Sequence, residues 1–401
     1  MSAPVAVPVQ VDRLQRNALV AAAIGIVGCA AFGLANPAQF FRSWLFAFLF
    51  WSNVAIGCLS ITMIHHLSGG MWGLVIRRVL EAGTRTLKFL PLLFLPIVIG
   101  LHQIFAWSHA DAVATDPMLR HKSLYLNPPF FVGRAVFYFA VWFLLAHFLN
   151  KGSLALDAGP NLKTERRLRG IAGGGLVLMG LTITFASVDW AMSLDPHWFS
   201  TIYGVLFMIG QALSALTFVI LVMAALYKER PFEGVVQPSH IHDLGKLMLA
   251  FTMLWAYMHL SQFVITWSGN LPEEIPWYIR RSHGGWQYLA ILIVLFHFVL
   301  PFLMLLSRDL KRNVNTLAVI AGLVFVFRSL DLFWVVAPEL GGHEATAALR
   351  VHVLDVAAFL AVGGIWLTLF ARELKDRPML PVGDPEIREL IDEAAAERAG
   401  A

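Results

Sequence analysis

The chain has 401 residues, of which 58% are hydrophobic and 14% are charged, and its formal net charge at pH 7 is +4. A water-soluble fold of this length cannot bury so much apolar surface, so the composition excludes a soluble globular enzyme and indicates lipid as the solvent. The small positive charge gives little support to a nucleic-acid partner, and basic patches in such a chain more often contact anionic lipid.

Ten apolar segments of about 20 residues follow one another without the period-two alternation of barrel strands. In a bilayer every backbone amide must bond within its own segment or within a closed barrel, which leaves helices as the remaining possibility. We therefore predict an all-α polytopic membrane protein with ten transmembrane helices near residues 17–35, 40–63, 86–107, 128–149, 170–190, 198–227, 245–267, 286–307, 315–336 and 346–370.

The first segment lacks the small-residue cleavage site of a signal peptide, so we expect a retained helix. Lysine and arginine are more frequent in alternate loops, which predicts that both termini are cytoplasmic. The expected domains are a cytoplasmic N-terminus (1–16), a membrane domain (17–371) and a cytoplasmic tail (372–401).

Two short motifs recur four spans apart. Residues 101–108 end in Ile-Phe-Ala-Trp-Ser and residues 261–268 end in Val-Ile-Thr-Trp-Ser, whereas 185–189 (FASVD) matches 327–331 (FRSLD). The offset predicts two four-helix bundles, about 40–190 and 198–336, related by parallel duplication and flanked by the first and last spans.

Ionisable side chains lie inside several spans. On the predicted topology most of them occupy the outer halves of the helices, with Arg328 nearer mid-depth. A charge at the bilayer centre costs about 2.5–3.5 kcal/mol on insertion scales, so these groups must pair or be hydrated. They are His102, Arg134, Asp189, His259, Arg328, Asp331, His352 and Asp355.

Two pairs have a three-residue spacing that places both members on one helix face, namely Arg328 with Asp331 and His352 with Asp355. Such pairs serve either as ion pairs that lock helices together or as proton-handling groups, since a histidine beside a carboxylate titrates near neutral pH. The sequence leaves both interpretations open.

We expect no catalytic residue, metal site or cofactor on this chain. Both cysteines, Cys29 and Cys58, lie in apolar spans, and no Cys-x-x-Cys-His haem-attachment motif is present. His102 and His259 are the best-matched pair for a bis-histidine haem, but no second matched pair supports that alternative.

Two loops are unusually rich in aromatic and charged residues, at 187–204 and at 267–281. Their composition suits a docking face for a partner outside the membrane. The candidate docking residues are Asp195, His197, Glu273, Glu274, Arg280 and Arg281.

These loops also carry a resemblance. The runs SVDWAMSLDPHWFSTIYG (187–204) and HDLGKLMLAFTMLWAYMHLSQFVITWSGNLPEEIPWYIRR (242–281), with YLNPPFF (125–131) followed by Arg134, resemble the ActF family of membrane proteins. Members of this family belong to bacterial alternative complex III, a quinol:cytochrome c oxidoreductase of the inner membrane. The resemblance implies an NrfD-like fold of ten helices with two four-helix bundles.

The resemblance also implies partners: a pentahaem cytochrome c subunit, an iron–sulfur subunit, a sister NrfD-like quinol-binding subunit, small membrane anchors and, in some members, a terminal oxidase. The c-type haems and iron–sulfur clusters would reside on other subunits, quinol would be the substrate, and phospholipid would be bound. Proton translocation has been proposed for the ActF family, and here its pathway would be sought at Asp189, Asp331, Arg328, His259, His352, Asp355 and His102.

Three further functions compete with a proton-coupling subunit. The charges could be helix staples in a purely structural scaffold. Alternatively, a quinol could bind this chain itself near His102, Arg134 and Asp189. A stand-alone transporter is the third, although no paired spans interrupted by Gly or Pro suggest discontinuous helices.

Overall fold

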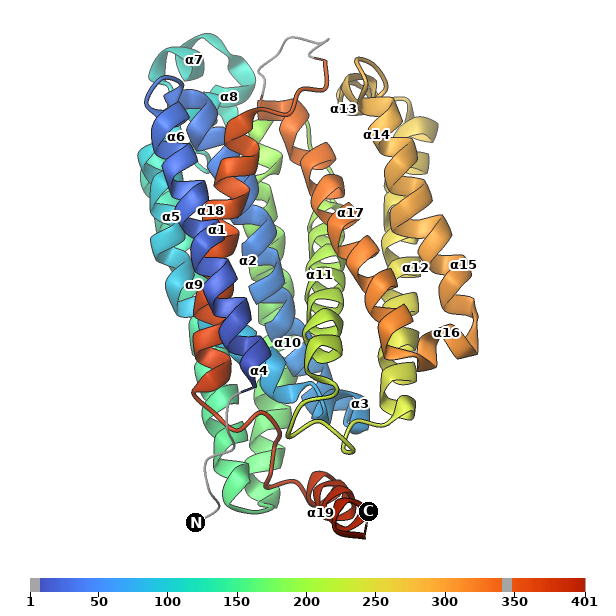
Figure 1. Ribbon diagram of the computed structural model, residues 1–401. Helices are drawn as coiled ribbons and strands as arrows, with labels where there is room; N and C mark the ends of the chain where they lie inside the picture. The colour runs from blue at the N-terminus through green and yellow to red at the C-terminus, as the bar shows by residue number, and fades with distance from the viewer. Residues whose placement is uncertain (1–7, 341–347, 401) are drawn as a thin grey trace.

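The computed structural model describes residues 8–340 and 348–400, and every secondary-structure element in these residues is helical (Figure 1). Ten helices among them are long and apolar enough to cross a membrane, which confirms the prediction of an all-α, multi-pass membrane protein. Their bounds are α1 (Val9–Gly33), α2 (Pro37–Ser68), α4 (Arg77–Arg85) continued by a 3₁₀ turn and α5 (Leu90–Ile99), α9 (Pro128–Ala155), α10 (Leu162–Trp190), α11 (Tyr203–Leu226), α12 (Pro238–Gly269), α14 (Trp286–Ile293) continued by a π turn (Val294–Val299) and α15 (Leu300–Leu306), α17 (Val314–Leu340) and α18 (Val353–Lys375).

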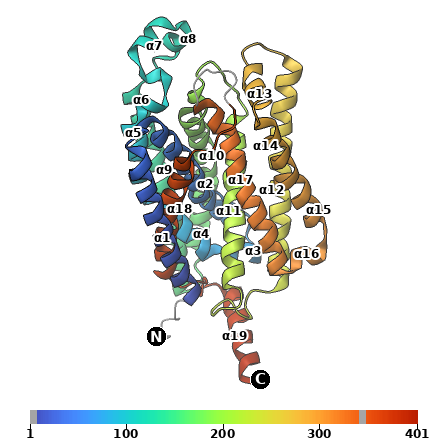
Figure 2. The ribbon, with the colours of Figure 1, turned by 45° about the horizontal axis from the view of Figure 1, so that its top comes forward.

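Shorter helices lie between and beyond these spans: α3 (Met71–Leu74), α6 (Leu101–Ile104), α7 (Ala110–Thr115), α8 (Pro117–Lys122), α13 (Ile275–Arg281), α16 (Arg308–Arg312) and α19 (Pro385–Gly400). Helix α1 begins and α18 ends at the same end of the molecule, and α19 lies beneath that end (Figures 1 and 2). Helices α7, α8 and α13 lie at the opposite end (Figure 2). We call these the α19 end and the α13 end.

Proline and asparagine define where several long helices start. Pro37, Pro128 and Pro238 each occupy the first turn of a helix, where a missing N–H costs nothing. Asn127 caps α9 by accepting a hydrogen bond from the Phe130 N–H at 3.0 Å. These local signals determine the residues at which α2, α9 and α12 begin.

Several helices begin earlier than the predicted spans, such as α1 at Val9 instead of residue 17 and α10 at Leu162 instead of residue 170. Two other spans differ for a local reason. The third span was expected to reach residue 107, but α5 ends at Ile99, and the helix is interrupted at Gly100. The sixth was expected from residue 198, but α11 begins at Tyr203 because the Asp195-Pro196 turn delays it. The expected start of the last span at residue 346 lies outside the described residues.

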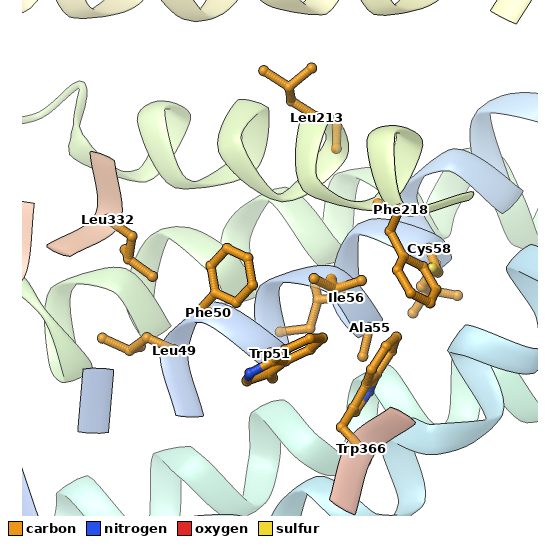
Figure 3. Packing of buried hydrophobic residues seen from close by; sticks show 14 of the residues in the cluster. Leu49, Phe50, Trp51, Ala55, Ile56, Cys58, Leu213, Phe218, Leu332 and Trp366 are labelled. Atoms are coloured by element: carbon orange, nitrogen blue, oxygen red, sulfur yellow. The ribbon is translucent and has the colours of Figure 1, made fainter. Parts of the chain in front are cut away.

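Helices α2 and α11 form the centre of the molecule. In the most apolar 18-residue stretch of each helix, 94% of the residues of α2 are buried, against 22% of those of α12 at the periphery. Their contact is close, because a Cβ added at Gly57 would lie 2.0 Å from the Gln211 carbonyl oxygen. Around this contact, aromatic side chains from α2, α11 and α18 interdigitate, among them Phe50, Trp51, Phe218 and Trp366 (Figure 3).

Helix α1 packs along α18 through small residues. A Cβ added at Gly25 would lie 2.3 Å from the Ala361 nitrogen, and one added at Gly364 would lie 2.4 Å from the Ala22 nitrogen. Small residues that let two backbones approach are the usual basis of helix association in lipid, where apolar area alone gives no preference for protein over acyl chains.

Candidate functional site

Five of the eight ionisable residues predicted inside the spans lie in two buried clusters. We name them the Asp189 cluster (Tyr125, Arg134, Tyr138 and Asp189) and the Asp331 cluster (Trp255, His259, His297, Arg328 and Asp331). Asp189 and Asp331 are 0% and 1% exposed, so their charges are withdrawn from both lipid and bulk water.

The Asp189 cluster joins α9 to α10. Arg134 donates from Nε and Nη2 to the two carboxylate oxygens of Asp189, each at 2.8 Å, which is a bidentate pair. Tyr138 Oη donates to the same carboxylate at 2.8 Å, and Arg134 Nη1 donates to the Tyr125 carbonyl at 2.8 Å. The Tyr125 ring also stacks on the guanidinium, 3.8 Å from its centroid. The Asp189 charge is thus fully compensated.

The Asp331 cluster draws its groups from α12, α17 and the π turn. Arg328 Nη1 and Trp255 Nε1 donate to Asp331 Oδ2 at 2.5 and 3.0 Å. His259 Nε2 lies 3.9 Å from the other oxygen, Oδ1, which is too far for a direct hydrogen bond. Asp331 therefore keeps one oxygen that no described side chain reaches at hydrogen-bonding distance.

A small cavity lies beside the Asp331 cluster. It measures about 10 Å³, and Tyr203, His259, Arg328 and Asp331 are among its lining residues. A space of about 10–15 Å³ suffices for one water molecule when polar partners surround it. The cavity therefore has room for a single water among the polar side chains of the Asp331 cluster.

His297 completes the Asp331 cluster from the π turn. The centroid of the His297 ring lies 4.2 Å from that of Trp255, and the centroid of the His259 ring lies 4.5 Å from the same indole. His297 is 0% exposed, and neither ring nitrogen has a hydrogen-bond partner in the described part of the chain. π turns inside helices are frequent at functional sites.

A third network lies at the α13 end and involves the predicted docking loops. Glu339 Oε1 and Oε2 accept from Arg281 and Arg280 at 2.8 and 2.9 Å, and Arg280 also bonds to Asp195. Arg281 further donates to the Trp334 carbonyl at 3.0 Å. Asp195, Arg280 and Arg281 therefore tie the 187–204 loop, α13 and the end of α17 together within the chain.

The pKa values of groups in these outer segments follow their surroundings. Burial lowers the pKa of the Arg281 guanidinium, and the Glu339 carboxylate opposes that shift. Desolvation alone would raise the pKa of Asp116, but hydrogen bonds from the Met118 and Leu119 amides and from His197 outweigh it and lower the pKa. His197 Nε2 lies 2.7 Å from Asp116, which connects the loop to α8.

The other predicted residues lie apart from the two clusters. His352 caps α18: its Nδ1 accepts from the Leu354 N–H, and Asp355 accepts from the His352 N–H at 2.8 Å. The two side chains thus form a capping box, whereas the spacing had suggested a facing acid–base pair. Asp355 also accepts from Ser43 at 2.5 Å. His102 Nδ1 bonds to Ser108 at 3.0 Å, Glu273 is exposed and Glu274 is half-buried.

Sequence reasoning missed several members of these networks. Tyr138 and Trp255 donate hydrogen bonds to the two carboxylates, but the sequence does not show that their O–H and N–H groups face a carboxylate on another helix. Glu339 was missed because it lies beyond residue 336, where the ninth span was expected to end, whereas α17 continues to Leu340. The adjacent cations Arg280 and Arg281 were a usable signal, since a buried pair of arginines requires a nearby carboxylate.

Fold and site together define a multi-pass helical membrane protein whose intramembrane charges meet inside the helical core. Neither a model of a known protein family nor a curated protein sequence matches the chain.

Proposed function

We propose that the chain is a non-redox membrane subunit of a quinol-oxidising respiratory complex of the alternative complex III type, where it supports proton translocation and assembly. The observation that carries this proposal is the Asp331 cluster. His259, Arg328 and Asp331 line a cavity the size of one water, and Oδ1 of Asp331 lies 3.9 Å from His259 Nε2, a gap that a water can bridge.

The chemistry of the Asp331 cluster suits a proton relay. Histidine changes charge closest to neutral pH, and intramembrane ionisable groups mark proton pathways when they face a cavity inside the bundle. His259 is half-buried at 21% side-chain exposure, whereas Asp331 is buried, so a proton could pass from the rim through one water to the carboxylate. Arg328 compensates the charge of Asp331 between transfers.

The duplicated-bundle arrangement belongs to the same proposal. Asp189 and Asp331 occupy matching positions of the repeated motif, near the ends of α10 and α17, although the donors to the two carboxylates come from helices that the repeat does not equate. The matching positions of the two buried aspartates support two related bundles, about 40–190 and 198–336, in an NrfD-like fold.

The proposed setting follows the resemblance of the 187–204 and 242–281 runs. The chain would lie in the bacterial inner membrane with both termini cytoplasmic. Its neighbours would be a pentahaem cytochrome c subunit, an iron–sulfur subunit, a sister quinol-binding subunit, small anchors and, in some organisms, a terminal oxidase. Haems, iron–sulfur clusters and quinol would be handled by these neighbours.

The test is Asp331→Asn in the complex purified from its native membrane. We expect the complex to assemble and to oxidise quinol, while the number of protons translocated per electron falls by more than half. Asp309→Asn is the matched control, because Asp309 is an exposed carboxylate on α16. Normal proton translocation in an assembled Asp331→Asn complex would contradict the proposal.

A structural scaffold is the second candidate, and the Asp189 cluster favours it. Its carboxylate is fully occupied by the bidentate arginine and Tyr138, as a helix staple would be. A scaffold predicts that Asp331→Asn and Asp189→Asn both fail to assemble, which subunit recovery after purification distinguishes from loss of proton coupling.

A further inference from the structure

We propose that the cavity beside Arg42, at the α13 end, binds a phosphate-type oxyanion. The cavity measures about 240 Å³. It lies between the start of α2, the 102–109 segment, the turn at Leu194 and the end of α17. This site shares no residue with the Asp331 cluster, and of the residues considered for a proton pathway it includes only His102.

Arg42 is the group that requires a ligand. It is partly buried, its Nε is fully covered, and that atom has no hydrogen-bond partner in the described residues. No carboxylate of residues 8–340 or 348–400 lies within ion-pair distance of its guanidinium. The covered Nε is a donor that no described group satisfies, so an anion that reaches the guanidinium would stabilise it.

The neighbouring charges do not neutralise Arg42. Glu339 also lines the cavity, but it is bound by Arg280 and Arg281, and Asp195 is bound by Arg280. Three guanidinium groups thus face two carboxylates, which leaves one positive charge. A guanidinium is well suited to a phosphate, because its planar fork can donate two hydrogen bonds at once.

The rest of the lining suits a small anion with an apolar neighbour. His102, Gln103 and His109 provide polar edges, and Ile104, Phe105, Leu194 and Leu340 provide apolar walls. The volume is below the roughly 300–1,000 Å³ typical of pockets for drug-sized ligands. A phosphate fits these conditions, either as the headgroup of a phospholipid or as the free ion.

The test is native mass spectrometry of the full chain, purified in detergent and stripped of lipid. Three probes are titrated separately: phosphatidylglycerol, diacylglycerol with the same acyl chains, and inorganic phosphate. We expect one equivalent of a phosphate-bearing probe to bind the wild type, and Arg42→Gln to weaken it about tenfold or more. Diacylglycerol should not bind at this site. Arg42→Lys should retain part of the affinity because it keeps the charge.

Arg120→Gln is the matched control, because Arg120 is an exposed arginine at the same end, on α8. Binding of phosphatidylglycerol alone assigns the site to a lipid headgroup, and binding of inorganic phosphate with the same dependence on Arg42 assigns it to the free ion. The proposal is overturned if neither phosphate probe binds the wild type, if diacylglycerol binds as well as phosphatidylglycerol, or if Arg42→Gln and Arg120→Gln have equal effects. The wild-type titrations decide the matter even if Arg42→Gln does not fold.

Discussion

At the scale of single residues, the Asp189 carboxylate has every hydrogen bond it needs from Arg134 and Tyr138. Asp189→Asn should lower the free energy of unfolding by about 3–5 kcal/mol, because it leaves the Arg134 charge buried and unpaired. Tyr138→Phe removes one hydrogen bond to a charged group and should cost about 1.5–3 kcal/mol. Denaturant unfolding in detergent measures both.

Tyr257→Phe is the control for this series, because Tyr257 is 62% exposed on α12. It should change the free energy of unfolding by less than about 0.5 kcal/mol. If Tyr138→Phe behaved like Tyr257→Phe, the hydrogen bond to Asp189 would not contribute to stability.

Gly210 provides the space that Arg328 occupies. A Cβ at this position would lie 2.2 Å from Arg328 Nη2, and the Gly210 carbonyl accepts from Arg328 Nε at 3.3 Å. Gly210→Ala should therefore displace the guanidinium from Asp331 and cost about 1–3 kcal/mol. Gly322→Ala is the control, since its added Cβ would make an ordinary contact of 3.7 Å with Leu221. Equal melting temperatures for the two variants would disprove the displacement.

The two carboxylates differ in what the sequence could predict of them. The pairing of Arg328 with Asp331 follows from their spacing on one helix and is present in the structure. The pairing of Arg134 with Asp189 crosses from α9 to α10, and helical periodicity within one segment contains no information about which faces of two helices meet. His352 and Asp355 show the limit of spacing: at a helix start, the same interval produces a cap.

At the scale of helices, the number and class of the elements were predictable, because length and hydropathy decide them. The residues at which the helices begin and end were less predictable. The third span was placed too late along the chain, since α4 begins at Arg77 and its buried polar groups interrupt the apolar run. Arg78 is 2% exposed yet paired with Glu81 and Asp157, and a hydropathy window cannot register such pairing.

The contact between α1 and α18 depends on backbone proximity. Because the Cβ of Gly25→Ala would lie 2.3 Å from the Ala361 nitrogen, the two helices would have to separate. We expect faster hydrogen exchange in α1 and a loss of about 1–3 kcal/mol, while α11 remains protected. Hydrogen-exchange mass spectrometry in lipid nanodiscs measures this.

The control for that change is Gly170→Ala on α10, whose added Cβ would meet nothing within 4 Å. It should leave exchange in α1 unchanged. If Gly25→Ala also left α1 unchanged, close backbone approach would not be what holds α1 against the rest of the protein.

At the scale of the whole molecule, burial separates a central pair of helices from the periphery. In the most apolar stretch of each helix, 94% of the residues of α2 and 83% of those of α11 are buried, whereas only 28% are buried in α1 and 22% in α12. The Asp189 cluster lies between α9 and α10, and the Asp331 cluster lies between α12 and α17, with Arg328 against α11. This division could not be read from hydropathy, because the ten segments are similarly apolar and only tertiary packing distinguishes them.

Orientation in the membrane is a property of the whole chain, and the distribution of lysine and arginine predicts the α19 end to be cytoplasmic. Single cysteines test it in a background where the buried Cys29 and Cys58 are replaced by alanine. Asp111→Cys on α7 and Glu389→Cys on α19 are both exposed positions, at opposite ends of the molecule. In intact cells with a permeable outer membrane, a membrane-impermeant maleimide should label Asp111→Cys, and it should label Glu389→Cys only after the inner membrane is opened. The reverse labelling pattern would contradict the predicted topology. It would place the Arg42 cavity and the docking loops on the cytoplasmic side. The proposed cytochrome c partner, outside the inner membrane, could not reach them there.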